Sequence, residues 1–195
     1  MSVLKSTLII LMASLMIAGG CRSAKTKSPN GKVLNVKDFG AKGNGKTDDA
    51  SAIQSALNAL PVQGGVLIFE PGDYLVGKGV SIKGKSRFEI KGQGAKIIGR
   101  AGLPKTPQNA LLTIENCENF RVSNIVLDGN RAKRPTVANQ HPCHNLRILD
   151  VRFADFDNIT SINSMQDGFT LQDNRSNPKS VHHVRFLNCI ARNNY

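Results

Sequence analysis

Short apolar stretches separated by glycine and proline turns dominate the first half of the chain. Most hold two to four apolar residues, which is typical of short strands and too short for helices. The predicted strands cover residues 66–69, 74–76, 80–82, 88–90 and 96–99. Pro71-Gly72 and the glycines at positions 92 and 94 supply turns between them. The pattern predicts a strand-and-turn protein, and a content of 18 glycines with no tryptophan agrees with it.

One segment departs from this pattern and predicts an amphipathic helix. Its apolar residues recur at helical spacing, at positions 53, 57 and 60. Thr47 or Asp48 is placed to cap the first turn, and Pro61 with the following glycines ends the helix. We interpret Asp48 and Asp49 as structural carboxylates that complement the helix dipole, not as catalytic ones.

An internal repeat is visible from residue 111 onwards. Residues 117–127 align with 143–153 at an offset of 26, and a third copy begins at Val181. A short repeat of this kind predicts coils that bury their apolar positions only against neighbouring coils. The third position of the pattern holds Asn124, Asp150 and His183, residue types that tolerate a left-handed backbone in tight turns. His183 is therefore interpreted as a turn residue.

Cys117 and Cys143 occupy equivalent positions in this alignment, so they are predicted to stack in adjacent coils. The spacing would permit a disulfide. Two reduced core cysteines are preferred, because directly stacked parallel neighbours rarely have suitable side-chain dihedral angles. Cys189 has no equivalent partner in the alignment.

The N-terminus has the pattern of an export signal. Lys5 precedes an apolar core over residues 8–18, and small residues then lead to Cys21. This pattern predicts a lipoprotein signal over residues 1–20 with lipidation of Cys21, and simple secretion is the alternative. Residues 21–32 read as a flexible basic tether, and residues 33–195 as the folded domain. The predicted location is the cell envelope, lipid-anchored, or outside the cell.

The formal net charge is +12, and five of the positive charges precede residue 33, which leaves +7 for the rest of the chain. A basic body suits an anionic partner. For an exported protein, acidic polysaccharide is the expected partner, while a merely solvated basic surface is the alternative. We expect no nucleic-acid partner, because no nucleic-acid-binding module is visible.

The stretch Asn35–Asp49, followed by the predicted helix and by Gly64–Tyr74, resembles the N-terminal capping segment of the pectate-lyase-like superfamily. The resemblance implies an all-β fold, a right-handed parallel β-helix with an N-terminal capping α-helix. It also implies an acidic, uronate-containing polysaccharide such as pectin as substrate. In this family, catalytic groups come from successive coils that face one groove.

The segment Ser164–Gln172 holds the best catalytic candidate, Asp167, because Asp-Gly-Phe resembles the first catalytic-acid segment of polygalacturonase-type glycosidases. A turn aspartate, with Gly168 supplying special backbone angles, is the alternative. Asp173 is a second candidate acid, and Thr170 and Gln172 are candidate substrate-binding residues.

This chain departs from the family's catalytic motifs, and these departures narrow the choice of reaction. The second acid pair of the hydrolases would fall on Asn193 and Asn194, which cannot exchange a proton. The epimerase motif that would follow Phe169 lacks its histidine here. Glycoside hydrolysis and β-elimination therefore stay open as reactions, and a non-catalytic glycan-binding protein is the rival.

A basic loop after Asp128 holds three further candidates for binding a uronate: Arg131, Lys133 and Arg134. A lyase would need its substrate carboxylate neutralised, by arginine or by Ca²⁺, and Asp155 with Asp157 could contribute to a calcium site. No zinc-type spacing is present, and no cofactor is required by the sequence. The pattern reaches Tyr195 without a visible cap, so the chain is expected to be part of a longer protein. The sequence does not predict an oligomeric state.

Overall fold

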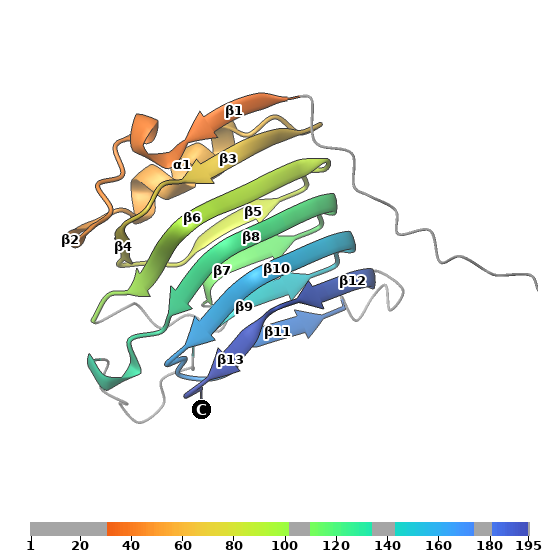
Figure 1. Cartoon of the computed structure of the whole chain (residues 1–195). Coiled ribbons are helices and arrows are strands. Elements are labelled where there is room, and N and C mark those ends of the chain that lie inside the picture. Colours follow the sequence, from red (N-terminus) through yellow and green to blue (C-terminus); the bar gives the residue numbers. More distant parts are fainter. Residues whose placement is uncertain (1–30, 102–109, 134–142, 174–180, 195) are drawn as a thin grey trace, which may run out of the picture.

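The computed structural model describes residues 31–101, 110–133, 143–173 and 181–194. Its strands wind around a common apolar interior, and each pairs in parallel with a strand of a neighbouring coil (Figure 1). The chain is a right-handed parallel β-helix, which confirms the predicted fold. No helix in these described ranges has the length and hydropathy of a membrane span.

The larger sheet, called sheet A, has the order β1-β3-β6-β8-β10-β12. These strands are β1 (Lys32–Asn35), β3 (Gly65–Phe69), β6 (Phe88–Gly99), β8 (Glu118–Asp128), β10 (Arg152–Ile162) and β12 (His182–Leu187). Three short strands extend it: β2 (Asn44–Asp48), β4 (Asp73–Val76) and β13 (Ile190–Arg192). β4 pairs with β2 and β6, and β13 pairs with β10.

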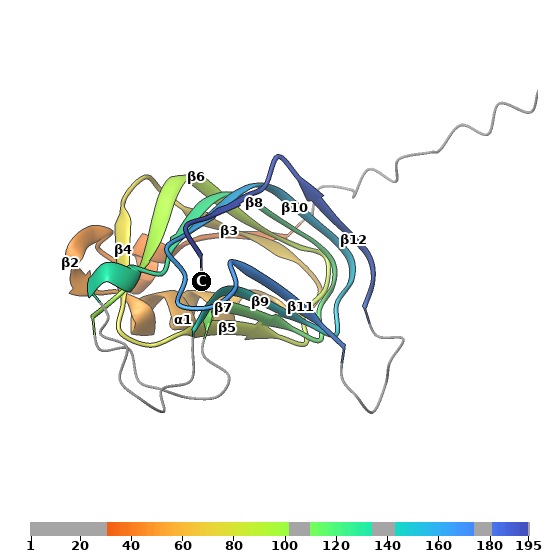
Figure 2. The same ribbon diagram turned by 90° about the horizontal axis from the view of Figure 1, so that it is seen from below.

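The smaller sheet, called sheet B, has four strands in the order β11-β9-β7-β5. They are β5 (Val80–Lys83), β7 (Ala110–Glu115), β9 (His144–Leu149) and β11 (Phe169–Gln172). Seen along the axis, sheet B closes one side of the coils and sheet A curves around the other (Figure 2). The outer faces of the two sheets are therefore separate surfaces.

Every predicted strand in the first half is present, but the strands predicted at 88–90 and 96–99 are two parts of the single strand β6. The glycines between them do not form a turn. They form a bulge, where the pairing of β6 with β8 skips between Lys91 and Ala95 and then resumes.

The predicted helix is α1 (Ala50–Ala59), which lies at the N-terminal end of the stack (Figure 1). Its apolar face is buried, with Ile53 and Leu57 in the core. Beside this face, the Gln54 amide donates to the Ser81 carbonyl and accepts from the Ser81 N–H, both at 2.8 Å. Gln54 thus satisfies the free edge of β5, and α1 protects the first strand of sheet B from pairing with another chain.

The two aspartates before α1 are structural, but the predicted cap is wrong in detail. The residue preceding the helix is Asp49, and its buried carboxylate accepts from the Lys42 and Gly43 N–H groups at 2.7 and 2.9 Å. Asp48 accepts from the Ala50 N–H at 3.1 Å and from the Gly77 N–H at 3.0 Å. Asp49 therefore fastens the preceding turn, while Asp48 serves the first turn of the helix.

The predicted repeat with an offset of 26 is wrong. Strand pairing sets Asp155 of β10 opposite Arg121 of β8, and Arg185 of β12 opposite Asp155. The alignment at 26 superposed a sheet B strand on a sheet A strand, because both carry the same apolar spacing. Cys117 and Cys143 consequently do not stack, since each precedes a strand of a different sheet, β8 in sheet A and β9 in sheet B.

Both of these cysteines are buried free thiols, and Cys189 is a half-buried one. The preferred interpretation of reduced core cysteines is therefore confirmed for Cys117 and Cys143. Burial raises the pKa of the Cys117 thiol, which keeps it protonated and unreactive.

The left-handed conformation predicted for three residues is confirmed at each of them, with φ of 56° at Asn124, 50° at Asp150 and 56° at His183. They lie at three different places in the coils, however: Asn124 lies within β8, Asp150 between β9 and β10, and His183 within β12. Asn124 lies beside Asn158 of the following coil, and His183 shares its position with Phe153. Side-chain chemistry predicted the left-handed backbone correctly, although the alignment that grouped these residues was wrong and Asn124 and His183 lie within strands instead of tight turns.

Candidate active site

A polar cluster lies on the outer face of sheet B, where β9 and β11 begin. The pairing of these strands sets Phe169 opposite Leu146. Just before it, the Asn145 N–H donates to the Asp167 carbonyl at 3.2 Å. Parallel pairing therefore brings Asp167 beside His144, the first residue of β9, although a full coil of the chain separates them.

Three side chains of the cluster meet within hydrogen-bonding distance. His144 Nδ1 lies 2.8 Å from Thr170 Oγ1 and 3.2 Å from Asp167 Oδ2. The Thr170 hydroxyl also lies 3.2 Å from Asp167 Oδ2 and donates to it. The His144 side chain is 13% exposed and that of Asp167 is 53% exposed, so the cluster is open to solvent on the carboxylate side.

The surroundings favour a neutral imidazole. Burial lowers the pKa of His144, the neighbouring Arg147 lowers it further, and Asp167 opposes both effects. Because the Thr170 hydroxyl donates its proton to Asp167, its oxygen can accept a hydrogen bond from the Nδ1–H group of His144. In this arrangement Nε2 carries the lone pair, and His144 is oriented as a proton acceptor.

A guanidinium stands next to this group. Arg147 lies opposite Thr170 in the strand pairing. Its Nε and Nη2 donate to Gln172 Oε1 at 3.4 and 3.2 Å. Because a guanidinium has five N–H donors, Arg147 retains donors for a carboxylate ligand while Gln172 holds its position.

Buried polar groups hold the start of β11 in place. Ser164 Oγ lies 2.9 Å from both the Asp167 and the Cys143 carbonyl oxygens, and its single O–H donates to this pair. The special backbone angle predicted for Gly168 is not found, since Gly168 is not among the glycines with positive φ. A Cβ at Gly168 would lie 2.4 Å from Asn194 Nδ2 and 2.8 Å from Ser161 Oγ, so a side chain there would displace these two side chains.

The structure gathers three of the predicted site residues, Asp167, Thr170 and Gln172, on one face. Asp173 lies just beyond β11, where its Oδ1 accepts from the Val181 N–H at 2.7 Å. Arg131 and Lys133 lie in the short 3₁₀ helix η2 (Arg131–Lys133) after β8, and no described contact joins them to the cluster. Arg134 and Cys21 lie outside the described residues.

The carboxylates proposed for calcium are engaged elsewhere. Asp155 accepts two hydrogen bonds from Arg185, Nε to Oδ1 and Nη2 to Oδ2, both at 2.7 Å. Asp157 pairs with Arg121. The described residues contain no group of three or more His, Cys, Asp or Glu side chains placed to hold a metal ion. The pair Asp155 and Asp157 therefore does not fit a calcium site.

Sequence reasoning missed His144 and Arg147. One sequence signal could have found them. Residues that pair between β9 and β11 are a constant number of positions apart in the sequence, as Arg147 and Thr170 are. His144 and Asp167 are the same number of positions apart. The alignment at 26 concealed it, because the loops between strands differ in length from coil to coil.

Comparisons with known proteins agree with this fold. The family profile described as rhamnogalacturonase A/epimerase, pectate lyase-like matches residues 33–188. Mannuronan C5-epimerase AlgE1 of Azotobacter vinelandii is 35% identical over 108 residues, which cover 50% of this chain and 8% of the relative. Alginate lyase 7 of the same organism is 34% identical over 108 residues, covering 50% and 13%.

Among solved structures, the ORF18 protein of Geobacillus virus E2 has a TM-score of 0.57 to this chain at 23% identity. The similarity covers 70% of this chain and 27% of that one. This likeness concerns the fold alone. The matched segments make up a small part of the length of each of these three relatives.

Proposed function

Because the chain belongs to the rhamnogalacturonase A/epimerase, pectate lyase-like family, we propose that it acts on an acidic, uronate-containing polysaccharide at the sheet B site. The cluster of His144, Asp167 and Thr170 carries this proposal. The proposal is also supported by two relatives, which are named for reactions on mannuronan and alginate. The positive charge of residues 33–195 suits such a substrate.

The reaction that the cluster supports best is β-elimination. Nε2 of His144 removes the proton from C5 of a uronate unit, next to its carboxylate. The electron pair of the C–H bond moves toward the carboxylate, where Arg147 stabilises the added negative charge. The pair then forms a C4–C5 double bond as the C4–O4 bond breaks, and the departing O4 takes up a proton. Asp167, through Thr170, stabilises the imidazolium that forms on His144.

Hydrolysis is less well supported by the same geometry. It requires two carboxyl groups on either side of the glycosidic bond. In the described part of the cluster, Asp167 is the one carboxylate, and its partner is an imidazole. Glu115 lies on the same sheet but pairs with Lys83 at 2.6 Å.

The test is a product analysis with alginate, polygalacturonate from pectin and a neutral glucan as substrates. We expect an unsaturated product that absorbs in the ultraviolet from one of the two uronate polymers, and none from the glucan. A product carrying added water would show hydrolysis and overturn elimination. An inverted C5 without chain cleavage would show epimerisation. No product with any polymer, together with binding, would make the protein a glycan-binding β-helix.

We further propose that the protein works in the cell envelope, anchored through Cys21. The basis is the apolar stretch at residues 8–18 followed by small residues before the cysteine. Cell fractionation and the intact mass of the native protein test this. A membrane-bound protein with a lipid mass on an N-terminal Cys21 is expected, and an unmodified soluble chain would contradict the anchor.

A further inference from the structure

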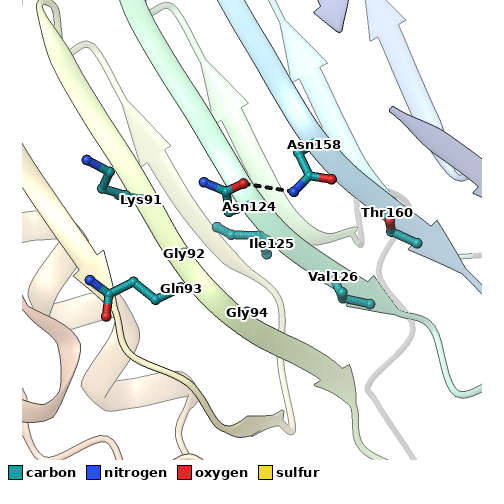
Figure 3. Close-up of a pocket in the computed structure, with 9 residues that line it drawn as sticks. All are labelled: Lys91, Gly92, Gln93, Gly94, Asn124, Ile125, Val126, Asn158 and Thr160. Carbon is teal, nitrogen blue, oxygen red and sulfur yellow. Dashed lines mark hydrogen bonds between the residues drawn. The ribbon is translucent and has the colours of Figure 1, made fainter. Parts of the chain in front are cut away.

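A second polar groove lies on the outer face of sheet A, and it shares no residue with the sheet B site. It forms beside the bulge of β6, where Gly92, Gln93 and Gly94 face the single residue Asn124 of β8. Its volume is about 370 Å³, within the range of roughly 300–1,000 Å³ usual for small-ligand sites. The groove is lined chiefly by Lys91, Gln93, Asn124, Val126, Asn158 and Thr160 (Figure 3).

The backbone of β6 is specialised to form this groove. A Cβ at Gly92 would lie 2.1 Å from the Asn124 carbonyl oxygen, so only glycine fits where the two strands touch. Gly94 adopts φ +83°, a conformation that side-chain-bearing residues rarely take. Bulges that depart from regular pairing in this way are frequent next to functional sites.

The side chains of the groove suit an acidic sugar. Asn124 and Asn158 have left-handed backbones, and Asn158 Nδ2 donates to Asn124 Oδ1 at 2.8 Å (Figure 3). That bond leaves the Asn124 amide donors and the Asn158 carbonyl for a ligand. Lys91 is exposed and forms no ion pair with another described residue. The described lining contains no carboxylate, so its net charge is positive.

We propose that this groove is a second, non-catalytic binding site for a uronate unit of the polysaccharide. Lys91 would bind the sugar carboxylate, and the amides of Gln93, Asn124 and Asn158 would bind its hydroxyl groups. The choice of uronate rests on the proposed function. A polymer held at two separate sites of one protein dissociates more slowly, because release of one site leaves the other engaged.

The test is an NMR titration of the whole chain carrying His144→Gln, which prevents turnover, with oligomannuronate, oligogalacturonate and a neutral glucan oligomer. We expect the amides of residues 91–94, 124 and 158 to shift with one of the uronates and not with the glucan. Lys91→Ala should weaken this binding about tenfold or more, as loss of a charged hydrogen bond implies. Lys46→Ala, an exposed lysine before α1, is the matched control and should leave binding unchanged.

A second variant pair tests the charge of the groove without removing a cation. Asn158→Asp keeps the shape and tolerates the left-handed backbone, and it should weaken uronate binding by repulsion. Asn119→Asp adds the same charge at an exposed left-handed position of β8 outside the groove (φ 54°) and should have no effect.

The outcomes separate this inference from the proposed function. Shifts confined to sheet B residues would overturn the second site and leave the proposed function standing. Equal binding of the neutral oligomer, or no effect of Lys91→Ala and Asn158→Asp, would also overturn it. Groove shifts that occur with the groove intact and are lost in both Lys91→Ala and Asn158→Asp would support the second site, whatever product the sheet B site forms. No shift anywhere with either uronate would overturn both proposals.

Discussion

Asp167 lies one coil after His144 and directly beside it, with Oδ2 of the carboxylate 3.2 Å from Nδ1 of the imidazole. The contact exists because β11 pairs with β9 in parallel and Phe169 falls opposite Leu146. A solenoid brings residues one coil apart into contact wherever their strands are in register. The register of β11 on β9 therefore defines the site, and several expectations follow from its geometry.

His144→Gln should lower the rate of product formation by roughly 10²–10⁴-fold, the usual contribution of a positioned acid–base group. Glutamine keeps the polarity but cannot take the C5 proton. Initial rates on the uronate polymer that the product analysis identifies measure the effect. His183→Gln, at an exposed position of β12, is the matched control and should retain full activity. Equal rates for the two variants would remove His144 from the mechanism.

Asp167→Asn should reduce turnover by at least about tenfold, because an amide does not stabilise the imidazolium on His144 as a carboxylate does. The unfolding transition should change little, since the Asp167 side chain is half exposed. Asp173→Asn, the other candidate acid of this segment, should have a smaller effect on turnover. If Asp167→Asn retained parental turnover, the carboxylate would have no role in catalysis.

Activity should depend on pH through His144. Burial lowers its pKa from the ordinary value of 6.5, so the imidazole stays a proton acceptor at pH values where an exposed histidine is charged. The rate should therefore rise with pH through a pKa below 6.5. A profile of turnover with an inflection above that value would contradict this assignment.

The same shift should affect stability in a defined direction. Between the lowered pKa of the folded state and 6.5, the unfolded chain binds more protons than the folded one. The contribution of His144 to stability is thus full above 6.5 and declines as the pH falls through this window. Urea unfolding at about pH 7.5 and about pH 5 should show a smaller loss of stability on acidification for His144→Gln than for the parent. An identical loss of stability in the variant and the parent would contradict the lowered pKa of His144.

Ion pairs between coils should contribute different amounts to the free energy of unfolding, depending on how deeply their side chains are buried. Asp155→Asn removes the largely buried carboxylate that Arg185 binds through two hydrogen bonds, and should cost about 1–3 kcal/mol of unfolding free energy. Glu118→Gln breaks the exposed pair with Arg152, in which the atoms lie 2.7 Å apart, and should cost under about 1 kcal/mol. Denaturant unfolding of both variants measures the difference. Equal losses would mean that burial does not strengthen the Asp155 pair.

Local sequence features predicted much of the fold because they act over a few residues. Apolar spacing located the strands of the first half, and helical spacing at 53, 57 and 60 located α1. Asparagine, aspartate and histidine marked left-handed turns because their side chains tolerate that backbone. Asp167, Thr170 and Gln172 were found as candidates because they lie in one recognisable segment, Ser164–Gln172, which leads into β11.

The pairing of coil positions, by contrast, is visible only in the folded chain. Sheet A and sheet B strands carry similar apolar patterns, so the sequence could not distinguish the offset of 26 from the registers in which the strands pair. Register depends on loop length and on packing against the neighbouring coil, and both are non-local. For that reason the β-helix and one carboxylate of the candidate site could be predicted from local sequence features. The partners of that carboxylate, His144 and Arg147, and the groove beside the bulge of β6 were decided by the stacking of the coils.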